Sequence, residues 1–136
     1  MTRSAARGYG RAMLRLIRFA FWAAGAFAFV MAVLPQPPHL PGDPSDKIQH
    51  ILAFAVLACL ASLGYRRLPA LRIGLGLSAF GAVIELVQLV PILHRDGDVV
   101  DWCADTLSAA LVLAAARLLQ RRLPGDAPGR PGEEQG

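Results

Sequence analysis

Four long apolar segments, separated by short polar stretches, dominate the hydropathy pattern of this chain. They cover residues 19–34, 48–65, 73–93 and 99–119, and each contains few or no charged side chains. A helix needs about 20 mostly apolar residues to cross a hydrocarbon core of about 30 Å. The pattern therefore predicts an all-α fold, a polytopic membrane bundle of four transmembrane helices.

The segments between these spans contain residues that end or begin helices. Residues 35–45 are rich in proline, which cannot continue a helix, and are expected to form an extended loop. Ser45 or Asp46 is a suitable N-cap for the second span. Residues 66–72 are expected to form a short basic turn, and residues 94–98 a tight polar turn.

The two ends of the chain differ in composition from the spans. Residues 1–18 carry five arginines and are expected to form a basic N-terminal segment. Residues 120–136 are basic and then rich in Pro, Gly and Glu, which predicts a disordered tail and leaves residues 19–119 as the membrane domain. A signal peptide cleaved near residue 28 is an alternative, but the apolar run continues to residue 34 and favours an uncleaved helix.

Composition and charge support a membrane protein with a defined orientation. Hydrophobic residues make up 54% of the chain, which is high for a soluble domain. The net charge is +4, but the basic residues lie beside the apolar spans, in residues 1–18, in the 66–72 turn and from Arg117 onward. Only Lys47 and Arg95 lie elsewhere. The positive-inside rule then places both termini in the cytoplasm, and we expect no nucleic-acid partner.

The two cysteines, Cys59 and Cys103, both lie in apolar spans and are expected to be buried and inert. In the predicted topology they differ in depth by on the order of 10 Å, at 1.5 Å rise per residue. A disulfide between them is therefore not expected.

Most polar residues of the spans fall in the outer half of the predicted bundle. They come from three spans and the last turn: Asp46, Lys47, His50, Glu85, Gln88, Arg95, Asp98, Asp101 and Asp105. Asp98, Asp101, Asp105 and Ser108 also share one helix face. Ionisable groups in membrane spans usually face protein or water and mark a site. A small polar pocket open to the extracytoplasmic side is the simplest account, and we take these nine residues as its candidate binding residues.

Several of these residues have a structural interpretation beside the functional one. Glu85, His50 and Asp101 are the candidate catalytic groups, yet His50 could serve as an interfacial hydrogen-bonding residue and Glu85 as a carboxyl that locks helices together. Lys47 could either snorkel to headgroups or pair with an acid. Arg95 could be a loop charge, hold Asp98 or Asp101 in an ion pair, or contact an anionic headgroup.

Other polar and small residues are expected to support the bundle. Gln88 is expected to join the hydrogen-bond network of Glu85. Trp102 is typical of an interfacial aromatic belt. The small residues of the third span are expected to be close helix-packing positions: Gly74, Gly76, Ser78 and Gly81.

No cofactor or metal motif stands out. The chain lacks HExxH and paired-His spacings, Walker and dinucleotide motifs and a nucleophile elbow, and the Asp96-Gly97-Asp98 turn does not continue as an EF-hand. We therefore predict no cofactor and no metal. A divalent ion remains a less favoured alternative, because four residues together offer one nitrogen and several oxygens: His50, Glu85, Asp101 and Asp105.

The ordered motifs resemble a known family. They are Asp46-Lys47-x-x-His50-x-x-x-Phe54, then Glu85-x-x-Gln88, then Arg95, Asp98 and Asp101-x-x-x-Asp105. Together they resemble the VanZ-like family of bacterial membrane proteins over roughly residues 40–120. The resemblance implies a small multi-pass helical protein of the bacterial cytoplasmic (inner) membrane. The family's named member is associated with low-level resistance to the glycopeptide teicoplanin.

This chain departs from the family pattern at its last motif. Asp105 and Ser108 stand where the pattern often has Asn and then Gly three residues on. The first change adds an ionisable group, which puts a purely hydrogen-bonding role at that position in doubt. The second puts a close glycine contact between helices in doubt. The resemblance consequently supports fold and location better than a resistance phenotype.

Two functions and one structural role remain open from the sequence. We expect a binding or accessory protein among membrane lipids, whose pocket recognises a lipid headgroup, an envelope precursor or an amphipathic, glycopeptide-type antibiotic. The alternative is a membrane-embedded enzyme that acts on a lipid-linked envelope substrate with Glu85 or Asp101 as general acid/base, His50 as proton partner and Arg95 holding an anionic group. In the third interpretation the polar network only fixes the helix arrangement.

Overall fold

The computed structural model describes residues 3–35 and 45–122, which form four α-helices and one short 3₁₀ helix. Their bounds are α1 (Arg3–Val33), α2 (Asp46–Gly64), α3 (Ala70–Gln88), η1 (Pro91–Leu93) and α4 (Val99–Arg122). No strand occurs in these two ranges. The predicted all-α architecture with four long helices is confirmed.

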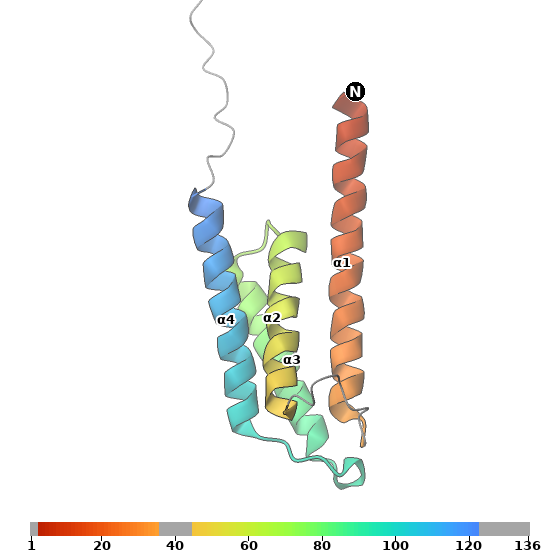
Figure 1. Cartoon of the computed structure of the whole chain (residues 1–136), viewed down its shortest axis with the longest axis vertical. Helices are drawn as coiled ribbons and strands as arrows, with labels where there is room; N and C mark the ends of the chain where they lie inside the picture. The colour runs from red at the N-terminus through yellow and green to blue at the C-terminus, as the bar shows by residue number, and fades with distance from the viewer. Residues whose placement is uncertain (1–2, 36–44, 123–136) are drawn as a thin grey trace, which may run out of the picture.

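The helices run up and down along one axis (Figure 1). The start of α1 and the end of α4 lie at one end of the bundle, and the connection between α3 and α4 lies at the other. α2 packs against both α4 and α1, and α3 packs chiefly against α4. The up-down course matches the alternation of inner and outer connections that a four-span protein requires.

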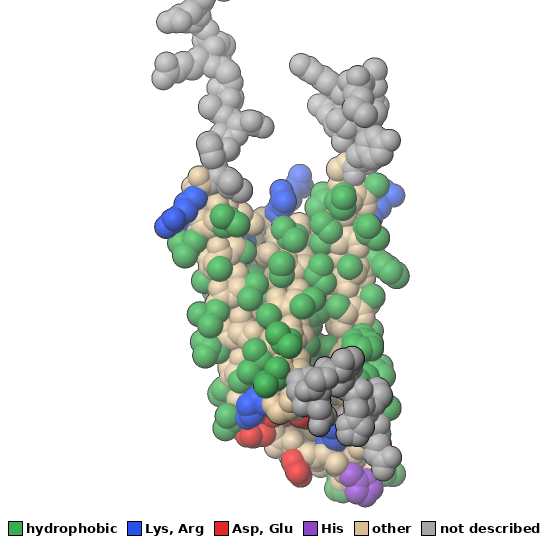
Figure 2. All heavy atoms as spheres, viewed as in Figure 1, with side chains coloured by type: hydrophobic (Ala, Val, Ile, Leu, Met, Phe, Trp, Pro, Cys, Tyr) green, Lys and Arg blue, Asp and Glu red, His purple; other side chains and the backbone are tan. Residues whose placement is uncertain are grey.

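All four α-helices are long and apolar enough to cross a membrane. Figure 2 shows hydrophobic side chains spread over the flanks of the bundle and Lys and Arg side chains at both of its ends. Acidic side chains gather at the end opposite the start of α1 and the end of α4. An apolar belt between two charged ends is the surface that a lipid bilayer covers. The chain is thus a multi-pass membrane protein by the length and apolarity of its helices.

The buried core belongs mainly to α2, α3 and α4. Phe54, Leu57, Ile84 and Leu113 are at most 4% exposed. α1 contributes Ala32 alone to the buried hydrophobic core of the described residues. Polar contacts attach α1 near its middle and near its C-terminal end: Arg18 Nε donates to Gly64 O (2.9 Å), Trp22 Nε1 to the Tyr65 hydroxyl (2.9 Å) and Gln88 Nε2 to Ala32 O (3.0 Å).

The helix ends agree with the sequence in part. Ser45 caps α2, because its hydroxyl accepts a hydrogen bond from the backbone N–H of Ile48. The third span was expected to reach residue 93, but α3 ends at Gln88. Pro91 lacks a backbone N–H and cannot continue the helix, so the chain turns into η1 and then into a left-handed residue at His94 (φ 49°).

The last span extends further than expected, and two predicted segments lie outside the described residues. α4 continues to Arg122 instead of ending at residue 119, so the start of the predicted tail is helical. The rest of that tail, residues 123–136, and the loop at 36–44 are not described.

Two expectations about small and sulfur-containing side chains have different outcomes. Cys59 and Cys103 are both exposed on the protein surface, so the expectation that they are buried was wrong. Both lie on helix faces that the other described helices leave exposed. Gly81 is a close packing position, because a Cβ there would lie 3.2 Å from Phe54 Cζ and 3.3 Å from Trp102 Cδ1. Gly76 has open space around it.

Candidate functional site

Three ionisable side chains from three different helices meet inside the bundle near the end that carries the connection between α3 and α4, which we call the outer end. His50 of α2 lies with its Nδ1 3.2 Å from Asp105 Oδ2 of α4 and 4.0 Å from Glu85 Oε1 of α3. His50 and Glu85 are each 8% exposed and Asp105 is 1% exposed. We call these three residues the inner cluster. The three side chains come close together because each lies on the face of its helix that points toward the other two helices.

The turn before α4 holds Glu85 in place. The backbone N–H of Asp98 donates to Glu85 Oε2 at 2.7 Å. The chain can approach this closely because residue 97 is a glycine, where a Cβ would lie 2.5 Å from the backbone oxygen of Glu85. The Asp98 side chain in turn accepts from the N–H of Val100 at 2.8 Å and so caps the first turn of α4. One oxygen of Glu85 is thereby fixed, and the other faces His50.

Two ion pairs surround the inner cluster toward the outer end. Lys47 Nζ pairs with Asp101 Oδ1 and lies 3.9 Å from Asp98 Oδ2. Arg95 Nη2 donates to Asp46 Oδ2 at 2.6 Å. We call these two pairs the outer rim. An ion pair of Arg95 with Asp98 or Asp101 was one of three alternatives, and the structure instead pairs Arg95 with Asp46 while Lys47 lies beside Asp98 and Asp101.

Two expected members of the network lie elsewhere. Gln88 is buried, and its amide donates to Ala32 O of α1. Ser108 lies on the predicted face of α4 and donates to the backbone oxygen of Ile51 at 2.9 Å. Both residues therefore join pairs of helices instead of completing the site.

The inner cluster leaves buried polar atoms without hydrogen-bond partners among the described residues. These atoms are His50 Nε2, Glu85 Oε1 and Asp105 Oδ1. Asp101 Oδ1 also makes no hydrogen bond by strict geometry, but it forms an ion pair with Lys47 and is satisfied in that way. A buried polar atom without a partner is costly in a protein interior. The cluster is therefore chemically incomplete as it stands.

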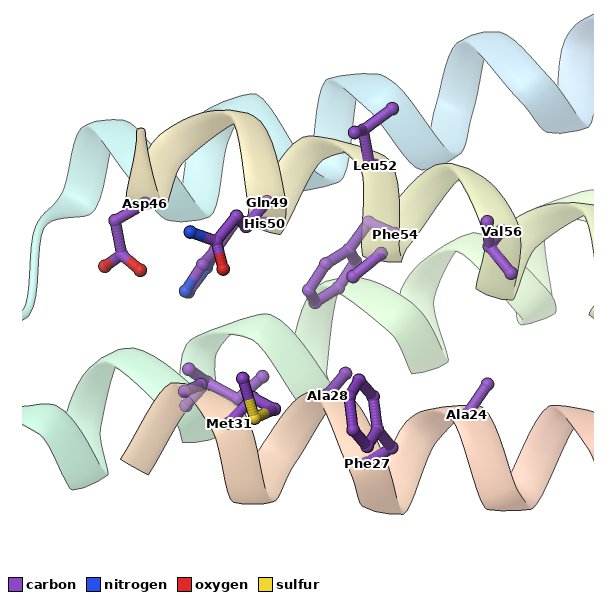
Figure 3. A pocket seen from close by; sticks show the side chains of 13 residues that line it. Ala24, Phe27, Ala28, Met31, Asp46, Gln49, His50, Leu52, Phe54 and Val56 are labelled. Carbon is purple, nitrogen blue, oxygen red and sulfur yellow. The ribbon is translucent and has the colours of Figure 1, made fainter. Parts of the chain in front are cut away.

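A cavity of about 290 Å³ lies between α1 and α2 beside the inner cluster. Asp46, Gln49 and His50 lie at one end of it on α2 (Figure 3). The rest of its wall is apolar: Ala24, Phe27, Ala28, Met31, Ala32, Leu52, Ala53, Phe54, Val56 and Ile84. His50 thus belongs both to the inner cluster and to the cavity wall. Glu85, Asp101 and Asp105 do not line the cavity.

This arrangement differs from the open polar pocket expected from the sequence. The acids and bases of α2, α3 and α4 contact one another instead of lining an open space, and the cavity is walled mainly by apolar residues. The part of α1 in this wall was missed. Ala24 and Ala28 are four residues apart on one helix face beside Phe27, a spacing that leaves a groove between large side chains.

A second polar contact between α3 and α4 was also missed. Trp102 Nε1 donates to Ser78 O at 3.0 Å and to Ser78 Oγ at 3.2 Å, and Ser78 Oγ lies 3.0 Å from Thr106 Oγ1. Trp102 is therefore a helix-packing residue and not only an interfacial one. The i, i+4 spacing of Trp102 and Thr106 on α4 is the signal that could have indicated a shared partner.

Comparisons with protein-family models, with curated proteins and with solved structures found no match to this chain.

Proposed function

We propose that the protein binds an amphiphile, with the polar headgroup at Asp46, Gln49 and His50 and an apolar chain in the groove between α1 and α2. The observation that carries the proposal is the composition of the cavity, which is polar at one end and apolar along the rest. Ligand pockets typically combine an apolar wall with a few polar groups that fix orientation, in volumes of about 300–1,000 Å³. A cavity of about 290 Å³ suits a chain or headgroup of modest size.

The position of the cavity favours a ligand that arrives through the bilayer. One wall is α1, which is the least buried helix. The polar end of the cavity lies at the outer end of the bundle, beside the outer rim of ion pairs. An amphiphile in a bilayer has the same arrangement, with its headgroup at the interface and its chain in the hydrocarbon.

Orientation and membrane identity are part of the proposal. Arg66, Arg67 and the arginines of the α1 start and the α4 end lie at the end opposite the inner cluster. The positive-inside rule then places that end in the cytoplasm and the polar end of the cavity outside. The resemblance to the VanZ-like family favours a bacterial inner membrane. It also makes an envelope precursor and a glycopeptide-type antibiotic the first ligands to test.

Binding is favoured over catalysis by the placement of the acids. A general acid or base has to come within hydrogen-bond reach of the bound substrate. Glu85 and Asp101, the expected catalytic acids, do not line the cavity, and Asp101 is paired with Lys47. Only His50 of the three candidates reaches the cavity wall. The membrane-embedded enzyme is accordingly the second candidate, and the buried unpartnered oxygen of Glu85 is the observation in its favour.

The test compares photolabelling of the wild-type cavity by a lipid with labelling of a variant whose cavity is filled by leucine side chains. Wild-type protein in nanodiscs is exposed to a phospholipid that carries a diazirine on one acyl chain, and the labelled peptides are mapped after irradiation. Label should appear on Phe27, Met31 and neighbouring residues of α1 and α2. Ala28→Leu together with Ala53→Leu should reduce this labelling at least about tenfold, because the new side chains occupy the groove. Competition with an unlabelled envelope precursor or glycopeptide then identifies the class of ligand.

A matched control lies on the same helix. Ala23 is exposed and lies outside the cavity wall, so Ala23→Leu adds one leucine to the same helix without filling the groove. Labelling should be unchanged in this variant. Equal labelling of the cavity-filled variant and the control, or label spread evenly over all four helices, contradicts the proposal. Turnover of a lipid-linked substrate by the purified protein favours the enzyme instead.

A further inference from the structure

The inner cluster has the composition of a metal site as well as of a polar network. His50, Glu85 and Asp105 each offer one ligand atom, and these three atoms lie within 4.8 Å of one another. One imidazole nitrogen and two carboxylate oxygens form a mixed ligand set that zinc and manganese accept. The three residues come from three helices, so the arrangement does not follow from local sequence spacing.

The interatomic distances fit a common ion. His50 Nδ1 lies 3.2 Å from Asp105 Oδ2 and 4.0 Å from Glu85 Oε1. With metal–ligand bonds of about 2.1 Å, two ligand atoms of a tetrahedral shell lie about 3.4 Å apart. The first distance is already in that range. The second distance, and the 4.8 Å that bounds the separations of all three atoms, require Glu85 Oε1 to move inward by about 1 Å, and this oxygen has no hydrogen bond to break.

The buried unpartnered atoms point to a missing cation. Glu85 Oε1, one of the three ligand atoms, is an acceptor without a donor among the described residues, and Asp105 Oδ2, the second carboxylate ligand atom, has only the His50 ring beside it. Asp105 lies six residues into α4, at a depth of about 9 Å along the helix, where a carboxylate is expensive. The nearest lysine, Lys47, is paired with Asp101. A divalent cation with a neutral imidazole balances both carboxylates, whereas a protonated imidazole balances only one.

The surroundings have the features of an outer coordination shell. Ligating carboxylates are usually held by a hydrogen bond to their second oxygen. The Asp98 N–H supplies that bond to Glu85 Oε2 and leaves Oε1 directed at His50. We infer that His50, Glu85 and Asp105 form a binding site for one divalent transition-metal ion of the zinc or manganese class, open to further ligands.

The test measures metal on the intact protein in detergent. Protein purified with a chelator is titrated with Zn²⁺, and in parallel with Mn²⁺ and Mg²⁺. We expect one equivalent of Zn²⁺ or Mn²⁺ per chain, little binding of Mg²⁺, and a visible absorption band when Co²⁺ replaces zinc. Loss of an outer-shell partner typically weakens metal binding 10–100-fold, so Glu85→Gln and Asp105→Asn, which each remove a ligand, should weaken it by about 100-fold or more.

A nearby acid provides the control. Asp96 is exposed in the same outer turn and is not part of the inner cluster, so Asp96→Asn removes one negative charge and no ligand. Its metal affinity should equal that of wild type. Equal weakening by Asp96→Asn would show non-specific attraction and overturn the inference.

Wild-type protein alone can also decide the question. Absence of a stoichiometric equivalent of Zn²⁺ or Mn²⁺, or a cobalt spectrum without nitrogen coordination, overturns the metal site even if the cluster variants fail to accumulate. The lipid-labelling experiment needs no added metal. A failed metal titration therefore leaves the proposed amphiphile site standing, and a failed labelling experiment leaves the metal site standing.

Discussion

His50 is the residue on which two sets of contacts converge. On one side it faces Asp105 and Glu85, and on the other it forms part of the cavity wall. A charged pair in a low-dielectric interior is destabilised strongly when one partner is removed, because the remaining charge is left uncompensated. A ligand bound in the proposed site would therefore contact the same imidazole that joins α2 to α3 and α4.

Gly97 allows the outer turn to reach Glu85. A Cβ at this position would lie 2.5 Å from the backbone oxygen of Glu85 and 3.1 Å from two atoms of Leu89. Gly97→Ala should displace the turn, break the bond from the Asp98 N–H to Glu85, and lower the free energy of unfolding by about 1–3 kcal/mol. Unfolding in mixed detergent and SDS micelles, followed by circular dichroism, measures this change.

Gly76 provides the comparison for Gly97→Ala. A Cβ at Gly76 meets no atom within 4 Å, and the residue lies inside α3. Alanine is favoured over glycine in a helix interior by about 0.8–1.0 kcal/mol, so Gly76→Ala should leave stability unchanged or raise it. If Gly97→Ala behaves like Gly76→Ala, the close approach of the turn to α3 does not contribute to the fold.

At the scale of elements, α1 differs from the other helices in how it is held. Among the described residues it contributes only Ala32 to the fully buried core, and it is otherwise attached by three hydrogen bonds and by partly buried side chains such as Phe21 and Phe29. A helix with few buried side chains can separate from its neighbours at low cost. This looseness lies where a ligand would enter the cavity between α1 and α2.

Gln88→Leu tests the attachment of α1 to α3. The substitution removes the hydrogen bond to Ala32 O and replaces the polar amide with an apolar side chain of similar size. Hydrogen bonds between membrane helices contribute about 0.6 kcal/mol on average and up to about 1.7 kcal/mol. The free energy of unfolding in SDS micelles should fall by that amount. Gln120→Leu, at an exposed position of α4, should change it by less than about 0.5 kcal/mol; an equal effect of both contradicts the role of Gln88.

Sequence periodicity was sufficient to predict the four helices, but not which acidic side chain pairs with which basic one. The apolar spans predicted four helices, and the inward positions of His50, Glu85 and Asp105 follow from helix geometry and the cost of charge in lipid. Which base meets which acid was not predictable. Arg95 pairs with Asp46 because of the path that the chain takes after Pro91, and that path depends on a break in α3 that hydropathy alone does not indicate.

The cavity was not predictable from the sequence for a related reason. It arises from the way in which α1 rests against α2, and apolar residues of α1 have no polar signal to mark them. Ala24 and Ala28 would line no cavity on a helix that packed against a different neighbour. Voids between helices depend on the whole arrangement of side chains, whereas hydropathy reports each segment separately.

At the scale of the whole molecule, the two ends of the bundle have different chemistry. Arginines gather at the end with the chain termini, and the acids and the turn before α4 lie at the other. The flanks between them are apolar. Such a molecule has one stable depth in a bilayer and one preferred direction across it.

Labelling of single cysteines tests this direction. In a Cys59→Ala, Cys103→Ala background, Asp96→Cys should react with a membrane-impermeant maleimide in intact cells. Arg66→Cys should react only after the membrane is opened, because it lies at the basic end. The native cysteines, which face lipid, should resist the reagent in intact membranes and should not form a disulfide. Labelling of Arg66→Cys from outside, with protection of Asp96→Cys, would show the opposite orientation.

During synthesis, His50 leaves the ribosome before its partner Asp105. Asp105 follows His50 by 55 residues, and chain elongation adds about 5–20 residues per second. For roughly 3–11 seconds, α2 and then α3 carry ionisable groups whose partners on α4 have not yet been made. These helices are expected to remain beside the insertion machinery until α4 arrives, so a chain truncated at residue 98 should be degraded faster in a pulse-chase experiment than the full chain. The inner cluster thus sets the order in which the protein can be built as well as its final shape.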